Sequence, residues 1–285
     1  MRVKDYYALT KPGIIYGNVM TATAGYLLAS RLYIHFELFV ATLAGTSIVI
    51  ASACVINNYI DRNIDKKMAR TKKRALVTGL IPAKNAIVFA VVLAFVGFFL
   101  LAAYTNFLVT IVGAVAFVVY VVLYGISKRR SVHGTIVGSF SGAAPVLAGY
   151  LAARGHFDSG ALIVFLILVV WQMSHFYAIA MYRFDDYRAA KIPVLPVKKG
   201  MQTTKIQILL YVIGFMVSCA LLTIYDYTGY TYLVVMLLFG LAWLRYAMKG
   251  FGAVDDSRWA RKMFLLSLIG ILALSIMMPL GTILP

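Results

Sequence analysis

Long apolar stretches alternate with short polar segments along the whole chain. Nine of these stretches approach the length of about 20 residues that a helix needs to cross a bilayer. They lie at about 14–30, 38–57, 84–103, 107–126, 135–153, 161–182, 207–225, 229–248 and 264–283. We therefore predict an all-α polytopic membrane protein with nine transmembrane helices in a single domain, residues 1–285. Only about 13 residues precede the first span, so we expect no cleavable leader and expect the first helix to act as the insertion signal.

Composition and charge agree with this pattern. Of the 285 residues, 62% are hydrophobic and 13% are charged, whereas a soluble domain has about 25% charged residues. The net charge of +17 does not indicate nucleic acid binding, because all Lys and Arg residues except Arg31 and Arg154 fall on one side of the nine predicted spans. The positive-inside rule makes that side cytoplasmic and places the C-terminus on the outer side. The cytoplasmic segments would be the N-terminus and the loops 58–83, 127–134, 183–206 and 249–263.

The polar segment 57–74, NNYIDRNIDKKMARTKKR, carries the first candidate chemistry. Asn57, Asp61 and Asp65 recur every fourth residue, so on a helix they form one ridge. Two carboxylates at this spacing repel each other by roughly a few tenths of a kcal/mol. A positive group between them would offset that repulsion.

A second acidic pair, Asp185 and Asp186, follows the sixth span. An even number of spans separates the two acidic segments, so both lie on the same side, where we expect them to face each other across a shared cavity. Oxygen ligands without His or Cys suit Mg²⁺, which commonly binds through one or two carboxylates and the phosphates of a substrate. The basic residues that would hold the phosphate oxygens are Arg70, Lys72, Lys73, Arg74, Lys128, Arg129 and Arg130.

This pattern has two interpretations. Carboxylates, a metal ion and nearby cations together suit the departure of a diphosphate from a substrate whose other end lies in the membrane. Alternatively, the two aspartates belong to a solvated helix end, with Asp65 paired to Arg62 or Arg70, and topology alone accounts for the loop lysines. A transporter is disfavoured, because its acidic residues would more often lie near the middle of the membrane.

Several motifs resemble those of a known family. Asn57-x3-Asp61-x3-Asp65 resembles the first acidic motif of the UbiA superfamily of intramembrane prenyltransferases. Five longer strings are similar to the branch of that superfamily that modifies heme, and in order they are TKPGIIYGN, CVINNYIDRNIDKKMARTKKRALVTG, SGAAPVLAGY, WQMSHFYAIAMYRFDDYRAAKIPVLPVKKG and WARKMFLLSLIGILALS. The resemblance implies a ring of nine transmembrane helices around a central cavity that is open to the cytoplasmic side and to lipid.

The activity implied by this resemblance is farnesyl transfer. Mg²⁺-dependent ionisation of farnesyl diphosphate would release diphosphate, the 2-vinyl group of heme b would capture the allylic cation, and water would complete a hydroxyethylfarnesyl side chain. The implied partners are farnesyl diphosphate, heme b and membrane lipid, in the cell inner membrane. A heme A synthase or a terminal oxidase assembly factor is a candidate protein partner. The closest alternative is a sister enzyme that prenylates an aromatic quinone precursor.

The resemblance also implies roles for individual residues. The implied ligands of Mg²⁺ and diphosphate are Asn57, Asp61 and Asp65. The implied further diphosphate contacts are Arg70, Lys73 and Arg74. In YGISK, residues 124–128, Lys128 would touch the diphosphate and the ring of Tyr124 would stabilise the allylic cation. A tyrosine of the interfacial belt is the alternative interpretation of Tyr124.

The second acidic segment departs from the superfamily pattern. Ala189 and Ala190 stand four residues after Asp185 and Asp186, so a second Asp-x3-Asp motif is absent. We still expect Asp185 and Asp186 to bind metal and diphosphate, but a second Mg²⁺ would have fewer protein ligands. Lys191 would supply positive charge there instead.

His175 lies inside the sixth predicted span. An ionisable residue within a membrane is a functional candidate, and imidazole binds heme iron. We therefore take His175 as a candidate heme contact. The alternative is a core histidine that is hydrogen-bonded to a neighbouring helix.

Overall fold

The computed structural model describes residues 3–285; Arg2, one of the basic residues assigned to the cytoplasmic side, lies outside this range. Every regular element within the range is a helix. In chain order the elements are α1 Val3–Leu9, α2 Pro12–Ala29, α3 Phe36–Asp65, α4 Ala75–Thr78, α5 Ala83–Tyr104, α6 Phe107–Val118, η1 Val119–Tyr124, α7 Gly125–Arg130, α8 Gly134–Arg154, α9 Ser159–Tyr182, α10 Phe184–Ala189, α11 Leu195–Ile224, α12 Tyr230–Lys249, η2 Gly250–Gly252 and α13 Asp256–Leu280.

Eight helices among residues 3–285 are long and apolar enough to cross a membrane. Each coincides with a predicted span, and α6, η1 and α7 together form the one at Phe107–Arg130. The predicted span at 14–30 corresponds to the 18-residue helix α2, which is not among the eight. The all-helical, multi-pass architecture is confirmed, whereas the count of nine membrane-crossing helices stays a prediction.

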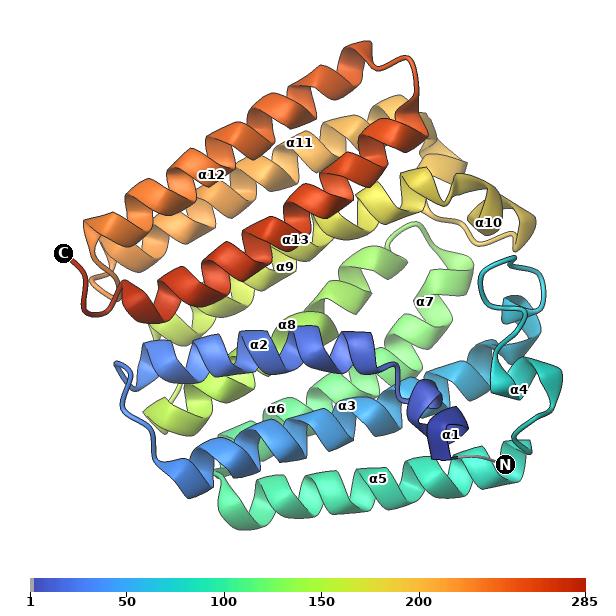
Figure 1. Ribbon diagram of the computed structural model, residues 1–285, viewed down its shortest axis with the longest axis horizontal. Coiled ribbons are helices and arrows are strands. Elements are labelled where there is room, and N and C mark those ends of the chain that lie inside the picture. The colour runs from blue at the N-terminus through green and yellow to red at the C-terminus, as the bar shows by residue number, and fades with distance from the viewer. Residues whose placement is uncertain (1–2) are drawn as a thin grey trace.

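The long helices run side by side, and the polar segments gather at one end of the bundle (Figure 1). The short helices α1, α4, α7 and α10 lie at that end, on the right of the view, together with the connection between α12 and α13. The C-terminus and the connections that hold Arg31 and Arg154 lie at the opposite end. The basic loops therefore share one end of the molecule, as their distribution in the sequence predicts.

The helices form a closed arrangement. Helices that follow one another in the sequence pack together, and the last one, α13, contacts both α2 and α9. Two glycines let α2 and α8 approach closely: a Cβ atom on Gly25 would lie 2.2 Å from the Val146 carbonyl oxygen, and one on Gly149 would lie 2.0 Å from that of Ala22. Small residues bring helix backbones together in membrane proteins in this way. Both helices form walls of the cavity described next.

Candidate active site

A cavity of about 840 Å³ lies between the helices. Its walls come mainly from α2, α3, α8, α9, α13 and the continuous helix α6–η1–α7, with single residues from α5 and α10. The charged residues that line it include Asp61, Asp65, Arg70, Arg74, Lys128 and Arg129. The apolar residues that line it include Leu101, Val109, Val112, Leu168, Leu268 and Ile271. A cavity with charged residues beside a mostly apolar wall suits a ligand with a charged head and an apolar body.

Asn57, Asp61 and Asp65 all line the cavity from α3, as their spacing predicts. Lys128 Nζ donates hydrogen bonds to Asn57 Oδ1 at 2.9 Å and to Asp61 Oδ2 at 2.5 Å. Arg129 donates to the other oxygen of Asp61, Oδ1, at 3.0 Å. The side chains of Lys128 and Asp61 are only 14% and 16% exposed, so water screens this pair weakly. The positive group expected beside the carboxylates is therefore supplied by α7.

Asp65 pairs with a different cation. Arg74 donates hydrogen bonds to Asp65 Oδ2 at 2.6 Å and to Asn58 Oδ1 at 3.2 Å. The loop after α3 thus folds back onto the end of that helix. The alternative pairing of Asp65 with Arg62 or Arg70 is not the one found here.

A π-helical turn, η1, brings two tyrosines to the cavity. The rings of Tyr120 and Tyr124 stack with their centroids 5.5 Å apart, and both residues line the cavity. Lys128 Nζ lies 4.9 Å from the centroid of the Tyr124 ring. Gly138 on α8 leaves room for that ring, because a Cβ atom there would lie 3.1 Å from it. The YGISK motif points to Tyr124, whereas nothing in the sequence points to Tyr120, since an unbroken apolar run gives no sign of a π turn.

Lys11, one of the cations on the side predicted to be cytoplasmic, also lines the cavity. It precedes Pro12 at the start of α2 and has a left-handed backbone, with φ at 55°. Burial lowers the pKa of its ammonium group, while Asp61 acts in the opposite direction. The Lys-Pro pair within TKPG is the signal that could have identified this residue.

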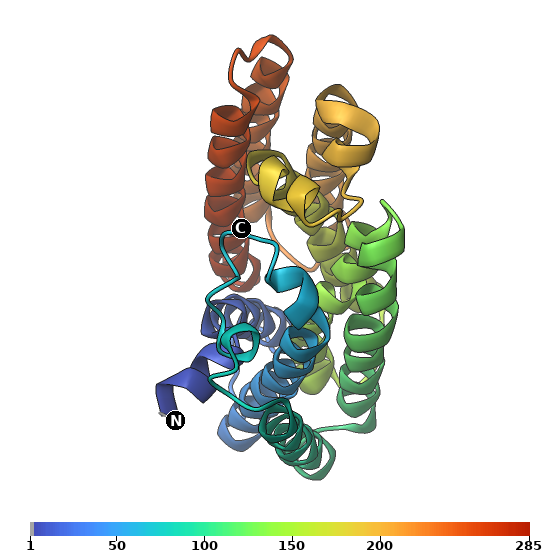
Figure 2. The same cartoon turned by 90° about the vertical axis from the view of Figure 1, so that its right-hand side faces the viewer.

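The second acidic segment lies at the edge of the site. Asp186 Oδ1 accepts a hydrogen bond from the Ala69 amide at 3.3 Å, so α10 touches the loop after α3. Figure 2, in which the polar end of the bundle faces the viewer, shows these two segments next to each other. Asp185 is 86% exposed and pairs with Arg188 at 2.9 Å. From α10, the residue that lines the cavity is Tyr187 and not either carboxylate, and burial raises the pKa of the Tyr187 phenol. Of the two carboxylates of the second acidic segment, Asp186 is the one that contacts the first.

The predicted diphosphate contacts fall into two groups. Arg70 and Arg74 line the cavity, and Arg74 is already held by Asp65. Lys73 and Lys191 are exposed and lie outside the cavity lining. Lys191 follows α10 with a left-handed backbone, at φ 55°. These two lysines are placed to act on an approaching anion through the long-range field and not by direct contact.

His175 lies on the wall of the cavity in α9 and is 9% exposed. Its Nδ1 atom is 2.7 Å from Ser267 Oγ on α13. The residue thus combines a hydrogen bond to a neighbouring helix with a position at the cavity surface.

The side-chain oxygen atoms on α3 are suitable ligands for a hard divalent cation. Asn57, Asp61 and Asp65 offer amide and carboxylate oxygens along one helix face, and no described residue donates a hydrogen bond to Asp65 Oδ1. Among residues 3–285, no three His, Cys, Asp or Glu side chains come together as a metal-binding group. A Mg²⁺ ion held here would therefore also need phosphate oxygens from a ligand, which is its usual mode of binding.

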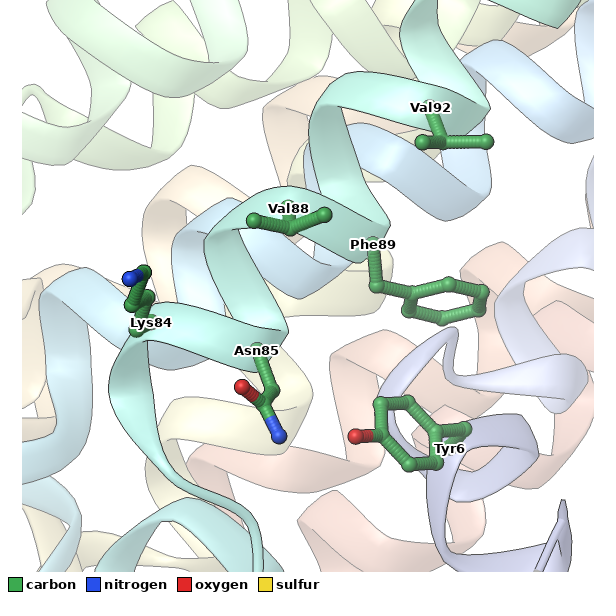
Figure 3. A pocket seen from close by; sticks show the side chains of 6 residues that line it. All are labelled: Tyr6, Lys84, Asn85, Val88, Phe89 and Val92. Atoms are coloured by element: carbon green, nitrogen blue, oxygen red, sulfur yellow. The ribbon is translucent and has the colours of Figure 1, made fainter.

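A second hollow, of about 400 Å³, lies between α1 and α5 (Figure 3). The residues that line it are Tyr6, Lys84, Asn85, Val88, Phe89 and Val92. Its lining holds one cation and no carboxylate, so the candidate chemistry lies in the larger cavity.

Comparisons with known proteins agree on one family. A sequence model of the UbiA prenyltransferase family matches residues 18–269. A protoheme IX farnesyltransferase of Yersinia pestis (strain Pestoides F) is 52% identical over 279 residues, which cover 98% of this chain and 94% of that protein. A structure of digeranylgeranylglyceryl phosphate synthase gives a TM-score of 0.82 at 19% identity, over 99% of this chain and 98% of that one. A UbiA homologue from Archaeoglobus fulgidus bound to GPP and Mg²⁺ gives a TM-score of 0.69 at 13% identity, over 96% and 99% of the two chains.

Proposed function

Because the chain belongs to the UbiA prenyltransferase family, we propose that it transfers the farnesyl group of farnesyl diphosphate to the 2-vinyl group of heme b. Diphosphate is released, and water completes the hydroxyethylfarnesyl side chain of the product. The 52% identity to a protoheme IX farnesyltransferase over nearly the whole chain supports this acceptor. The structural observation that carries the proposal is the cluster of Asn57, Asp61 and Lys128 on the wall of a largely apolar cavity.

The cations of the cavity bind the diphosphate head. Those that line the cavity beside the carboxylates are Arg70, Arg74, Lys128 and Arg129. Three of them pair with Asp61 or Asp65 before a ligand arrives, so an incoming diphosphate competes with carboxylates for the same N–H donors. Donors that turn toward the diphosphate stabilise the negative charge that develops as its bond to the farnesyl group breaks. Lys73 and Lys191 add long-range attraction at the same end.

The same proposal includes a divalent metal. Asn57, Asp61 and Asp65 would hold Mg²⁺, and the homologue solved with GPP and Mg²⁺ supports its use in this family. When bound, Mg²⁺ neutralises diphosphate oxygens and makes the diphosphate a better leaving group. Asp185 and Asp186 would serve as further ligands of metal and diphosphate only if α10 turned toward the cavity, because Asp185 faces solvent and Asp186 is bonded to Ala69.

The tyrosines of η1 stabilise the allylic cation. The face of the Tyr124 ring already attracts the Lys128 ammonium at 4.9 Å, and a carbocation at that face gains the same attraction. Tyr120, stacked against it, extends the aromatic surface by one turn. The apolar wall limits the access of water to the cation before the acceptor captures it.

Heme b lies in the apolar part of the cavity, next to His175. The whole chain acts as one prenyltransferase domain in the cell inner membrane, with the polar end toward the cytoplasm, because the basic loops share that end. Membrane lipid surrounds it, and a heme A synthase or a terminal oxidase assembly factor is the proposed protein partner.

The test is a direct comparison of acceptors. Purified protein is incubated with labelled farnesyl diphosphate and Mg²⁺ and with either heme b or 4-hydroxybenzoate. We expect label in a heme product and none in the aromatic compound. Label in 4-hydroxybenzoate alone would replace this function with that of a quinone-forming relative.

A further inference from the structure

The hydrogen bonds around His175 determine which ring nitrogen carries the proton. Ser267 Oγ lies 2.6 Å from the Phe264 carbonyl oxygen and 2.7 Å from His175 Nδ1. A carbonyl oxygen can only accept, so the Ser267 hydroxyl donates its single proton to Phe264. Ser267 Oγ must then accept from the ring, which places the histidine proton on Nδ1.

This arrangement leaves Nε2 as the nitrogen with a free lone pair. No carboxylate contacts the ring among the described residues, and a buried imidazolium without a counter-charge would be costly. The neutral ring with its proton on Nδ1 carries a lone pair on Nε2. No described residue donates a hydrogen bond to Nε2, and the side chain borders the cavity.

Three aromatic side chains hold the plane of the ring. Trp171 stacks on it with a centroid distance of 4.8 Å and an interplanar angle of 24°. Phe264 and Phe176 pack against it at 5.0 Å and 5.2 Å. The Trp171 indole also donates a hydrogen bond to the Ser267 carbonyl oxygen at 2.9 Å, so the same serine positions both rings.

We propose that His175 Nε2 binds the iron of the acceptor heme, and that Ser267, backed by the Phe264 carbonyl, is the positioning residue that holds the ring in the required tautomer and orientation. This inference rests on the proposed function, because it takes heme as the acceptor. Imidazole is a common ligand of heme iron. A metal-binding histidine usually donates its second N–H to a fixed acceptor that sets the tautomer, and the Ser267 hydroxyl fills that role here.

The group that accepts the hydrogen bond from His175 Nδ1 also affects how tightly the heme iron is bound. A carboxylate on Nδ1 would raise the basicity of the ring and strengthen the bond to iron. Here the acceptor is a neutral hydroxyl that is itself committed to a carbonyl. The bond to iron is therefore weaker than a carboxylate-backed one, which suits a substrate that has to leave after each turnover.

The test uses the full-length protein in detergent and follows ferric heme binding by the Soret spectrum and by electron paramagnetic resonance. The first variant is His175→Asn, whose amide nitrogen can keep the bond to Ser267 while the group at the Nε2 position is removed. We expect wild type to show an imidazole-ligated iron spectrum and His175→Asn to lose it. An unchanged spectrum with unchanged heme affinity in His175→Asn overturns the proposal.

The positioning role of Ser267 is tested separately. Ser267→Ala should weaken heme binding by on the order of tenfold or more, the usual effect of removing a partner behind a metal ligand, whereas Ser267→Thr keeps the hydroxyl and should bind like wild type. Ser275→Ala is the matched control, because Ser275 lies about two turns further along α13 and is a buried serine with no hydrogen-bond partner among the described residues. Equal effects of Ser267→Ala and Ser275→Ala on heme binding would show that Ser267 does not position His175.

Heme product formation by wild type separates this inference from the proposed function. If wild type forms the farnesylated heme while His175→Asn keeps the wild-type spectrum, the function stands and the ligand assignment fails. If wild type neither binds nor farnesylates heme, both fail together.

Discussion

Replacing Asp61 with Asn should have opposite effects on diphosphate binding with and without Mg²⁺. In the structure, Asp61 holds Lys128 at 2.5 Å and Arg129 at 3.0 Å, and these are the cations that a diphosphate would use. Without metal, the variant weakens the hold on both donors and removes a negative charge next to the ligand. With metal, the same change replaces a charged carboxylate ligand of Mg²⁺ with a neutral amide, which binds the ion more weakly.

The size of the metal-free effect follows from Coulomb's law. A negative charge about 4 Å from a unit charge on the diphosphate costs about 1 kcal/mol in water and about 4 kcal/mol at an effective dielectric constant of 20. The side chains of Asp61 and Lys128 are 16% and 14% exposed, so the site lies between these limits. We expect roughly 2 kcal/mol, or about 30-fold tighter binding in the variant.

Calorimetric titration with inorganic diphosphate, in EDTA and in saturating Mg²⁺, measures both effects. We expect Asp61→Asn to bind more tightly than wild type in EDTA and more weakly in Mg²⁺, with turnover reduced by about 10²–10³-fold. Asp226→Asn is the matched control, because Asp226 lies in the turn between α11 and α12 at the opposite end and its left-handed backbone, at φ 60°, tolerates Asn. Tighter binding of the Asp61 variant under both conditions would show that Asp61 is only a counter-ion and not a metal ligand.

Other changes test the packing of α2 against α8, the stabilisation of the allylic cation and the membrane topology. A Cβ atom at position 149 would lie 2.0 Å from the Ala22 carbonyl oxygen, so Gly149→Val forces side-chain atoms against α2. We expect this variant to be destabilised by about 1–3 kcal/mol, measured as a lower Tm in detergent. Tyr124→Phe should keep most activity and Tyr124→Leu should lose about 30-fold in kcat, since a desolvated cation–π contact contributes about 2 kcal/mol; equal rates would exclude the ring as a stabiliser. A cysteine at position 72 should react with a membrane-impermeant reagent only from the cytoplasmic side and one at position 154 only from outside, against a low background because both native cysteines are buried.

The membrane helices could be predicted because the length of an apolar run is set by the thickness of the bilayer. Their ends could not be predicted from hydropathy. α3 continues to Asp65, beyond the predicted end of that span at 57, because Lys128 and Arg74 compensate the carboxylates on its last two turns. α11, Leu195–Ile224, is interrupted by a kink at Gly200, whose backbone is non-helical with φ at 84°. The part after the kink still starts before the predicted position 207 and includes Lys205, whose ammonium pairs with Asp256 at 2.6 Å. Polar residues with partners inside the protein extend a helix past its apolar part.

In the candidate site too, the features that depend on local helix geometry could be predicted, and those that depend on the tertiary fold could not. The ridge on α3 could be predicted because it depends only on helical periodicity. Asp185 and Asp186 look equivalent in the sequence, but adjacent residues on a helix point about 100° apart, and only Asp186 reaches the loop after α3. Lys11 enters the cavity from a different helix, at a position that the fold alone determines.

The π turn η1 sets the angular register of everything that follows it in the helix. A π turn holds one more residue than an α turn, so if the same residues continued as an α-helix, the segment after them would be rotated by about 100°. Tyr124 and Lys128 would then turn away from Asn57 and Asp61, whose contacts with Lys128 are 2.9 Å and 2.5 Å. Val122 and Leu123 are about half exposed, at 46% and 51%. Along this stretch the backbone conformation matters more than the identity of the side chains, and a change that turned η1 into an ordinary α turn without removing a residue would misalign the reactive groups without changing any of them.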